Sequence, residues 1–158
     1  MRNFTRLQQS LGGRSRNQAN FKLQRGFSSF SSNEVFRIAV IGSGPSGYYT
    51  ANYLNKELAD SQEKRGFTTT IDVIDRFSIA GGLVRSGVAP DHPEVKNINN
   101  QLVALFQSSK PNGNQVNFYG NVEVGRTDEL QFDQTNLLIK IPFSLMQQSY
   151  HAIVIVFF

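Results

Sequence analysis

The sequence predicts an α/β fold built on a parallel β-sheet, and three observations support this prediction. Residues 36–41 form a short apolar run, rich in β-branched side chains, of the kind found in buried parallel strands. A glycine-rich turn and a helical pattern follow that run, and a second apolar run spans residues 68–74. Strand, helix and strand in this order are typical of parallel α/β proteins.

Composition limits the chemistry that the chain can perform. The 158 residues are enough for one domain with a hydrophobic core. The chain has no cysteine and only two histidines, so we expect neither a disulfide framework nor a metal centre. Any redox chemistry must then come from a bound organic cofactor. No apolar run reaches the roughly 18 residues of a transmembrane helix, and we expect no membrane span.

The positive charge of the chain is concentrated at its N-terminus. Residues 1–33 hold six of the 16 basic residues and none of the 12 acidic ones, so the charge gives no support for nucleic-acid binding by the rest. An arginine-rich, serine-containing segment without acids is typical of a mitochondrial transit peptide. Residues 25–29 also look like a matrix-protease site. We therefore predict a targeting segment at 1–33 and a domain at 34–158; a disordered basic tail is the alternative reading of residues 1–33.

A glycine pattern stands between the first predicted strand and the helix after it. Residues 42–47 read Gly-Ser-Gly-Pro-Ser-Gly, which is a G-x-G-x-x-G sequence in the context that a dinucleotide-binding turn requires. Gly42 permits the tight turn, Gly44 lets the backbone approach a pyrophosphate, and Gly47 lets the helix pack closely on the sheet. We expect the N–H groups at the helix N-terminus to face the phosphates.

The helix after this turn is predicted over residues 48–58. Its apolar positions are expected to be Tyr49, Tyr53 and Leu54. Residues 61–66 are polar, and we expect them to form a surface loop before the second strand.

A carboxylate follows the second predicted strand. Asp75 lies directly after residues 68–74 and 28 residues after Gly47. A carboxylate at this place can accept hydrogen bonds from the ribose hydroxyls of an adenine dinucleotide. Asp72 competes for this role but lies within the strand, so we predict Asp75; a solvated acid without a ligand is the alternative. The pattern predicts FAD or NAD and does not separate them.

The second half of the chain continues the α/β pattern. Asp91 and Glu94 have capping-box spacing, so a helix should begin near His92 and end before Pro111. Residues 116–124 then predict one or two strands interrupted by Gly120. Further apolar β-type runs lie at 137–141 and 151–156.

Four stretches resemble the mitochondrial adrenodoxin (ferredoxin) reductases. They are Val40–Ala51, Gly82–Lys96, Asn121–Gly125 and Tyr150–Val154. The second is the most specific, because it matches the family's G-L-V-R-x-G-V-A-P-D-H-P-x-x-K throughout. The likeness extends from about Arg37 to Ile155 and is weak between Glu129 and Gln148. It implies a parallel, Rossmann-like FAD-binding sheet of the glutathione-reductase type, incomplete at its C-terminal side.

The resemblance also implies a set of cofactor contacts. Ser46 would approach the FAD pyrophosphate together with the three glycines of the turn, and Asp75 stands where the family usually has Glu at the ribose. Gly82 permits a close backbone approach, Leu83 would pack on the flavin side, and Val124 would contact the adenine end. Arg85 and His92 would lie near the isoalloxazine. They are the candidate catalytic residues, Arg85 for stabilising negative charge on reduced flavin and His92 for tuning the flavin or assisting proton movement; a surface ion pair and a cap-adjacent residue are the alternatives.

The activity implied by the resemblance is NADPH:adrenodoxin (ferredoxin) oxidoreduction in the mitochondrial matrix. FAD takes a hydride from NADPH in this family, and single electrons then pass to a [2Fe–2S] ferredoxin. Two other classes remain open. A glutamate-synthase-type flavoprotein usually has iron–sulfur cysteines, which this chain lacks, and a plain NAD(P) dehydrogenase has no role for residues 82–97.

The chain departs from the family pattern towards its end. The family's NADP-binding domain has no counterpart in this sequence, and residues 135–145 read like an insertion, for which a mis-predicted gene model is one hypothesis. We therefore expect little reductase activity from the 158-residue chain alone. A truncated, catalytically inactive FAD-domain fragment is the alternative function.

Overall fold

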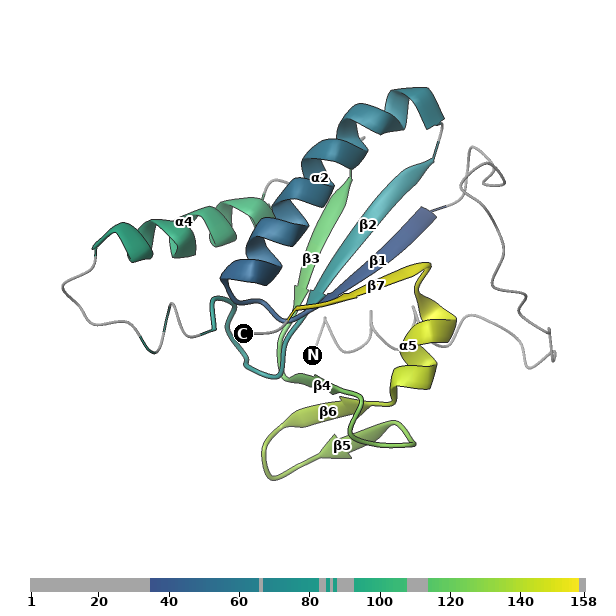
Figure 1. Ribbon diagram of the computed structural model, residues 1–158. Coiled ribbons are helices and arrows are strands. Elements are labelled where there is room, and N and C mark those ends of the chain that lie inside the picture. The colour runs from purple at the N-terminus through teal and green to yellow at the C-terminus, as the bar shows by residue number, and fades with distance from the viewer. Residues whose placement is uncertain are drawn as a thin grey trace.

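The structure is a computed structural model that describes residues 35–65, 67–82, 85, 87, 93–107 and 114–156. The predicted targeting segment at 1–33 lies outside these ranges. The elements in chain order are β1 (Val35–Ile41), α2 (Pro45–Arg65), β2 (Thr68–Ile74), α4 (Pro93–Gln107), β3 (Gln115–Tyr119), β4 (Val122–Val124), β5 (Gln131–Asp133), β6 (Leu138–Ile141), α5 (Phe143–Ser149) and β7 (Ala152–Ile155). Figure 1 shows the described helices packed around a parallel sheet, with a second, smaller sheet beyond one end of it.

The main sheet has the order β3-β2-β1-β7, and all of its strands are parallel. β1 and β2 pair along their whole length, from Val35 opposite Thr68 to Ile41 opposite Ile74. The predicted parallel α/β fold is thus confirmed, and β2 has the predicted bounds. The carboxyl ends of parallel strands lie at one edge, which is where open α/β sheets bind their ligands.

The two faces of the main sheet bury different sets of side chains. Alternate residues of β1 point to opposite faces, as a strand requires. One face packs against α2 and α4 in a cluster that includes Ile38, Val40, Ile71, Ala51 and Leu102. The other face packs against α5 and the small sheet in a cluster of Ala39, Ile74, Val122, Ile141, Met146 and Tyr150. The sheet is therefore covered on both faces, in agreement with the apolar character of β1 and β2.

The prediction for α2 was wrong in two respects. Tyr48 and Ala51 are buried against the sheet, whereas the side chains of Tyr49 and Tyr53 are 57% and 65% exposed. The small residue Ala51 allows the helix to approach the strands closely, and Tyr49 is turned away because successive helical residues are rotated by about 100°. The expected loop at 61–66 is also wrong, since α2 continues to Arg65; Gln, Glu and Lys in this stretch are good helix formers.

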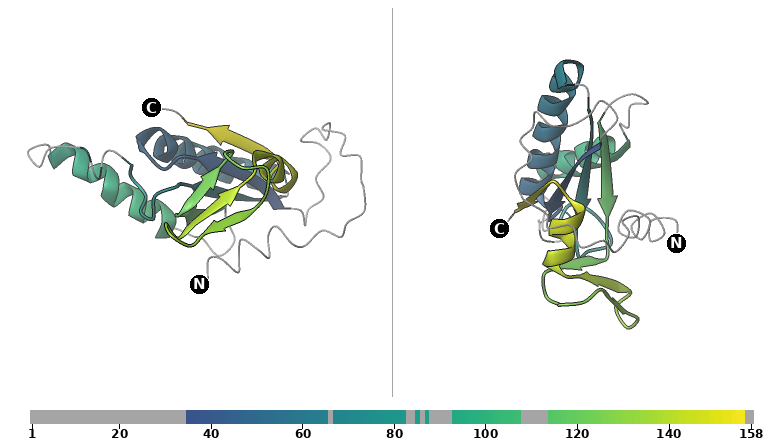
Figure 2. Two further views of the ribbon diagram at one scale, coloured as in Figure 1. Left: turned by 90° about the horizontal axis from the view of Figure 1, so that it is seen from below. Right: turned by 90° about the vertical axis from the view of Figure 1, so that its right-hand side faces the viewer.

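Residues 131–150 form structure that the sequence pattern only partly indicated. β6 lies between β4, to which it is parallel, and β5, to which it is antiparallel. Figure 2 shows this small sheet beyond the end of the main sheet, next to α5. The segment at 135–145, which reads like an insertion, supplies β6 and the start of α5. Its Ile141 is fully buried, so this segment is part of the core.

Candidate nucleotide-binding site

The glycine turn connects the carboxyl end of β1 to α2. Gly42 has φ 109°, and its N–H donates a 2.8 Å hydrogen bond to the carbonyl of Ile74 at the end of β2. A Cβ on Gly47 would lie 2.0 Å from the carbonyl oxygen of Gly42, and a Cβ on Gly42 would lie 2.7 Å from Cγ2 of Val156. These two positions therefore require glycine for the packing of the turn.

The start of α2 offers a phosphate-binding surface. The helix begins at Pro45. One of the hydrogen bonds of its first turn joins the N–H of Tyr48 to the carbonyl of Gly44. The N–H groups of the first residues of a helix have no partner within the helix, and the helix dipole makes this end partly positive. Ser46 is exposed beside these groups, while Gly44 is buried. This arrangement is suited to an anion such as a pyrophosphate.

Asp75 lies against the glycine turn. Its Oδ2 accepts hydrogen bonds from the backbone N–H and the hydroxyl of Ser43, at donor–acceptor distances of 2.7 and 2.6 Å. Its Oδ1 accepts a 3.0 Å hydrogen bond from the N–H of Phe77. The side chain is only partly buried, so it joins the glycine turn while it retains contact with solvent. Sequence reasoning predicted Asp75 and did not single out Ser43, because the two residues are 32 positions apart and only the fold brings them together.

A second glycine pair packs on the turn. The N–H of Gly81 donates to the carbonyl of Ser43 at 3.1 Å. A Cβ on Gly82, whose φ is 52°, would lie 3.3 Å from Cα of Gly44. Gly82 thus lies directly against Gly44 of the glycine turn. Arg85 is exposed just after it.

Two of the predicted flavin contacts fall outside the described residues. Leu83 and His92 both lie in the gaps of the description, so their predicted roles remain predictions.

The turn between β3 and β4 supports the Asp75 segment from the other side. The N–H of Asp75 donates to the carbonyl of Tyr119, and the N–H of Asn121 donates to the carbonyl of Phe77. A Cβ on Gly120 would lie 2.7 Å from the carbonyl oxygen of Ser78 and 2.8 Å from that of Phe77. Gly120 is therefore required for this contact, which sequence reasoning noted only as an interruption between strands.

Val124, the predicted adenine contact, lies at the end of β4. It is partly buried and packs against the cluster that covers the α5 face of the main sheet. The N–H of Val122, at the start of the same strand, donates a 2.9 Å hydrogen bond to the carbonyl of Asp75, so β4 begins beside the candidate site.

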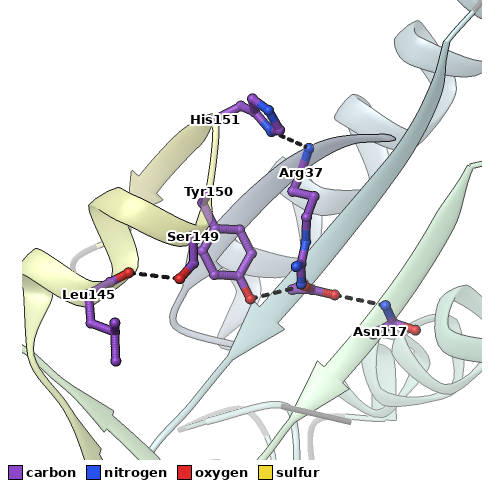
Figure 3. A network of polar contacts seen from close by, with 7 residues as sticks. Arg37, Asn117, Leu145, Ser149, Tyr150 and His151 are labelled. Carbon is purple, nitrogen blue, oxygen red and sulfur yellow. Dashed lines mark hydrogen bonds and ion pairs between the residues drawn. The ribbon is translucent and has the colours of Figure 1, made fainter. Parts of the chain in front are cut away.

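Asp72 is removed from the candidate site by its burial. It has no exposed surface, and its side chain is held by three partners. Oδ2 accepts from the hydroxyl of Tyr150 at 2.9 Å and pairs with Nη2 of Arg37 at 3.2 Å, and Oδ1 accepts from Nδ2 of Asn117 at 2.7 Å (Figure 3). Asp72 is thus a buried structural acid, and Asp75 stays the predicted site residue. We call these four residues the Asp72 network.

The Asp72 network changes the acidity of one of its members. Burial raises the pKa of Tyr150, and the negative charge of Asp72 and the hydrogen bond to it raise the pKa further. The tyrosine therefore stays protonated and donates to the carboxylate throughout the ordinary pH range. A buried carboxylate needs such partners because an unpaired buried charge is strongly destabilising.

Two kinds of feature are absent from the residues that the structure describes. No three His, Cys, Asp or Glu side chains gather there as a metal site would require. None of the described helices combines the length and the apolarity needed to cross a membrane.

The fold and this site define a dinucleotide-binding α/β protein. A parallel β1-α2-β2 unit, a glycine turn at the helix N-terminus and an acid after the second strand occur together in that class. No protein-family model matches the chain. Similar proteins are nevertheless found among curated sequences and solved structures.

Two curated relatives and one solved structure show which proteins of this class the chain is similar to. NADPH:adrenodoxin oxidoreductase, mitochondrial, of Bos taurus is 38% identical over 119 residues, which are 75% of this chain and 19% of that protein. The protein of the same name from Arabidopsis thaliana is 40% identical over 111 residues, which are 70% of this chain and 20% of that protein. A structure of FprA, a Mycobacterium tuberculosis oxidoreductase, superposes with a TM-score of 0.59 at 31% identity and covers 78% of this chain and 23% of that one.

The chain belongs to the NADPH:adrenodoxin oxidoreductase family, as its sequence motifs predicted. It spans about a fifth of the length of the curated relatives it matches, as the 19% of the Bos taurus protein shows.

Proposed function

We propose that this chain supplies the FAD-binding part of an NADPH-dependent adrenodoxin or ferredoxin oxidoreductase. One observation carries the proposal: the glycine turn, the start of α2 and the Asp75 carboxylate meet at the carboxyl ends of β1 and β2. This is the arrangement that binds the ADP half of a dinucleotide. Membership of a family whose relatives are named as NADPH:adrenodoxin oxidoreductases supports FAD chemistry over that of a plain dehydrogenase.

The residues present fit the ADP half of FAD. Gly44 has no side chain that would stand between the turn and a pyrophosphate, and the N–H groups at the start of α2 would face the pyrophosphate next to Ser46. Asp75 would accept from the ribose and Val124 would contact the adenine.

The flavin half would lie towards the segment after the Gly81–Gly82 turn. Gly82 and Leu83 would pack on the flavin side, and Arg85 and His92 would lie near the isoalloxazine ring. FAD, when bound, supplies the hydride acceptance from NADPH and the one-electron donation that the side chains of this chain cannot provide. Arg85 would stabilise negative charge and His92 would hold or move a proton.

FAD binding is the first test of this proposal. The purified 158-residue chain is titrated into FAD, and saturable quenching of flavin fluorescence is expected. Asp75→Ala should weaken binding by about tenfold or more, because a hydrogen bond to a charged group is lost. Asp128→Ala removes an exposed carboxylate outside the site and should bind as the parent does. Absence of saturable binding of both FAD and ADP would overturn the proposal.

The oxidoreductase part has its own test. NADPH and a [2Fe–2S] ferredoxin are supplied to the FAD-loaded protein, and reduction of the ferredoxin is followed by its absorbance. Ferredoxin reduction that depends on NADPH and FAD would show that this chain carries the activity by itself. FAD binding with no reduction of the ferredoxin is the result expected of a chain that supplies only the FAD-binding part.

The proposed location is the mitochondrial matrix. The support is the basic, acid-free composition of residues 1–33 and the word mitochondrial in the names of the relatives from Bos taurus and Arabidopsis thaliana. Residues 1–33 fused to a fluorescent protein should direct it to mitochondria. The same fusion with its six basic residues changed to Gln should remain outside, and equal import of both fusions would count against the proposal.

A further inference from the structure

The buried serine of the glycine turn joins three segments of the candidate site. Ser43 has no exposed surface, and its hydroxyl is 2.6 Å from Oδ2 of Asp75. Its carbonyl accepts from the N–H of Gly81 at 3.1 Å, and its hydroxyl oxygen lies 3.4 Å from the same nitrogen. Ser43 therefore contacts both the acid after β2 and Gly81 of the second glycine pair.

The hydrogen bonds to Asp75 leave it little capacity for a ligand. An ionised carboxylate offers about four acceptor directions, two on each oxygen. Both directions on Oδ2 are used by Ser43, one by its backbone N–H and one by its hydroxyl. One direction on Oδ1 is used by the N–H of Phe77. About one acceptor direction, on Oδ1, is left for a ligand.

We infer that Ser43 is a positioning residue that orients Asp75 so that the carboxylate accepts only one of the two ribose hydroxyls of a bound adenosine diphosphate group. The inference rests on the proposed function and adds to it how the ribose is recognised. The Ser43 hydroxyl is the part of this arrangement that depends on a side chain, because the N–H at position 43 is present for any residue except proline.

A short acid is needed for this geometry. The Asp75 carboxylate is separated from the backbone by one carbon, which places Oδ2 within hydrogen-bond distance of both donors of Ser43 and Oδ1 near the N–H of Phe77, two residues on. The same carboxylate is therefore fixed by its own loop and by the glycine turn before any ligand arrives. A fixed acceptor discriminates between two neighbouring hydroxyls better than a mobile one, since it cannot turn to reach both.

The first experiment compares three nucleotides on the full 158-residue chain by calorimetry. They are ADP, 2′-deoxy-ADP and 3′-deoxy-ADP. One deoxy nucleotide should bind about tenfold more weakly than ADP, and the other should bind within about twofold of it. Equal losses for both would show that Asp75 holds both hydroxyls and would overturn the inference. Absence of ADP binding itself would instead count against the proposed function, so the two failures are distinguishable.

The second experiment removes the hydroxyl. Ser43→Ala keeps the backbone N–H but frees one acceptor direction on Oδ2, so the ratio of the two deoxy-nucleotide affinities should fall from about ten towards one. This ratio is measured on one protein sample and does not depend on the fraction that is folded. Ser149→Ala is the matched control, since its hydroxyl donates to the carbonyl of Leu145 in α5 and lies outside the site. An unchanged ratio in Ser43→Ala would overturn the inference.

A double mutant separates positioning from general loosening of the turn. If Ser43 acts through Asp75, Ser43→Ala should change ADP affinity in the parent but by less than about twofold in an Asp75→Ala background. Equal effects of Ser43→Ala in both backgrounds would mean that the serine acts on the turn independently of the acid, and the inference would fail.

Discussion

The hydroxyl of Tyr150 donates a 2.9 Å hydrogen bond to Oδ2 of Asp72, a carboxylate with no exposed surface. The two residues are 78 positions apart in the chain. Tyr150 stands at the end of α5 and just before β7, while Asp72 is inside β2, so this hydrogen bond connects the edge of the main sheet to its interior. Arg37 strengthens the connection, because its guanidinium pairs with Asp72 and lies 5.1 Å from the centre of the Tyr150 ring.

Removal of the Tyr150 hydroxyl should destabilise the fold. Tyr150→Phe keeps the ring packed but leaves Asp72 with two of its three partners, and a hydrogen bond to a charged group contributes about 1.5–3 kcal/mol. We expect the free energy of unfolding in urea to fall by about that amount. Tyr53→Phe removes a hydroxyl from a 65% exposed side chain and should change it by less than about 0.5 kcal/mol. Similar values for the two variants would contradict the role of this hydrogen bond.

The raised pKa of Tyr150 predicts a loss of stability at alkaline pH. The folded protein holds the phenolic proton more tightly than the unfolded chain, whose tyrosines titrate near pH 10. The contribution is complete below about pH 10, and it falls by up to about 1.4 kcal/mol per pH unit above it, because only the unfolded state then releases the proton. Unfolding free energies measured from pH 8 to pH 11 should fall less steeply in Tyr150→Phe. Identical slopes would show that Tyr150 does not titrate in this way.

Removal of the carboxylate at the centre of the Asp72 network should cost more than removal of one donor. Asp72→Ala leaves Arg37, Asn117 and Tyr150 without their shared acceptor, and breaking a buried pair costs about 3 kcal/mol or more. Urea unfolding should show this loss, whereas Asp128→Ala, at an exposed position, should be close to the parent. A smaller loss for Asp72→Ala than for Tyr150→Phe would contradict this description of the network.

Gly120→Ala tests the support that the β3–β4 turn gives to Asp75. The added methyl group would lie less than 3.0 Å from the carbonyl oxygens of Phe77 and Ser78, so the segment after Asp75 must shift. We expect a loss of about 1–3 kcal/mol in stability together with weaker FAD binding. Ser78→Ala alters the same segment but keeps its backbone, and it should leave both quantities nearly unchanged. Parent-like FAD binding by Gly120→Ala would show that the segment tolerates the shift.

Short-range patterns were sufficient for the two strands of the first βαβ unit. β2 has the predicted bounds, and β1 differs by one residue, because apolar β-branched runs next to a glycine turn favour buried parallel strands. The glycine turn and Asp75 were predicted for the same reason, since their spacing along the chain already defines the site. Their ligand roles stay predictions, as do those of Leu83 and His92.

Other features depended on contacts between distant residues. Two adjacent tyrosines, Tyr48 and Tyr49, could each have faced the sheet. The choice between them depended on how closely α2 approaches the strands, and the sequence does not show this distance. β5 and α5 are short, three and seven residues long, and their patterns are too brief to predict without the partners they pack against.

The local order of apolar, glycine and acidic residues was thus enough to predict a parallel nucleotide-binding sheet and the family to which the chain belongs. The three-dimensional packing decided which partners hold each of the two neighbouring carboxylates. Asp72 and Asp75 differ by three positions in one strand region, yet one is buried among Arg37, Asn117 and Tyr150 while the other remains partly open to solvent. The reason is physical: a charge inside a sheet is stable only when residues from several strands converge on it, and that convergence exists only in the folded chain.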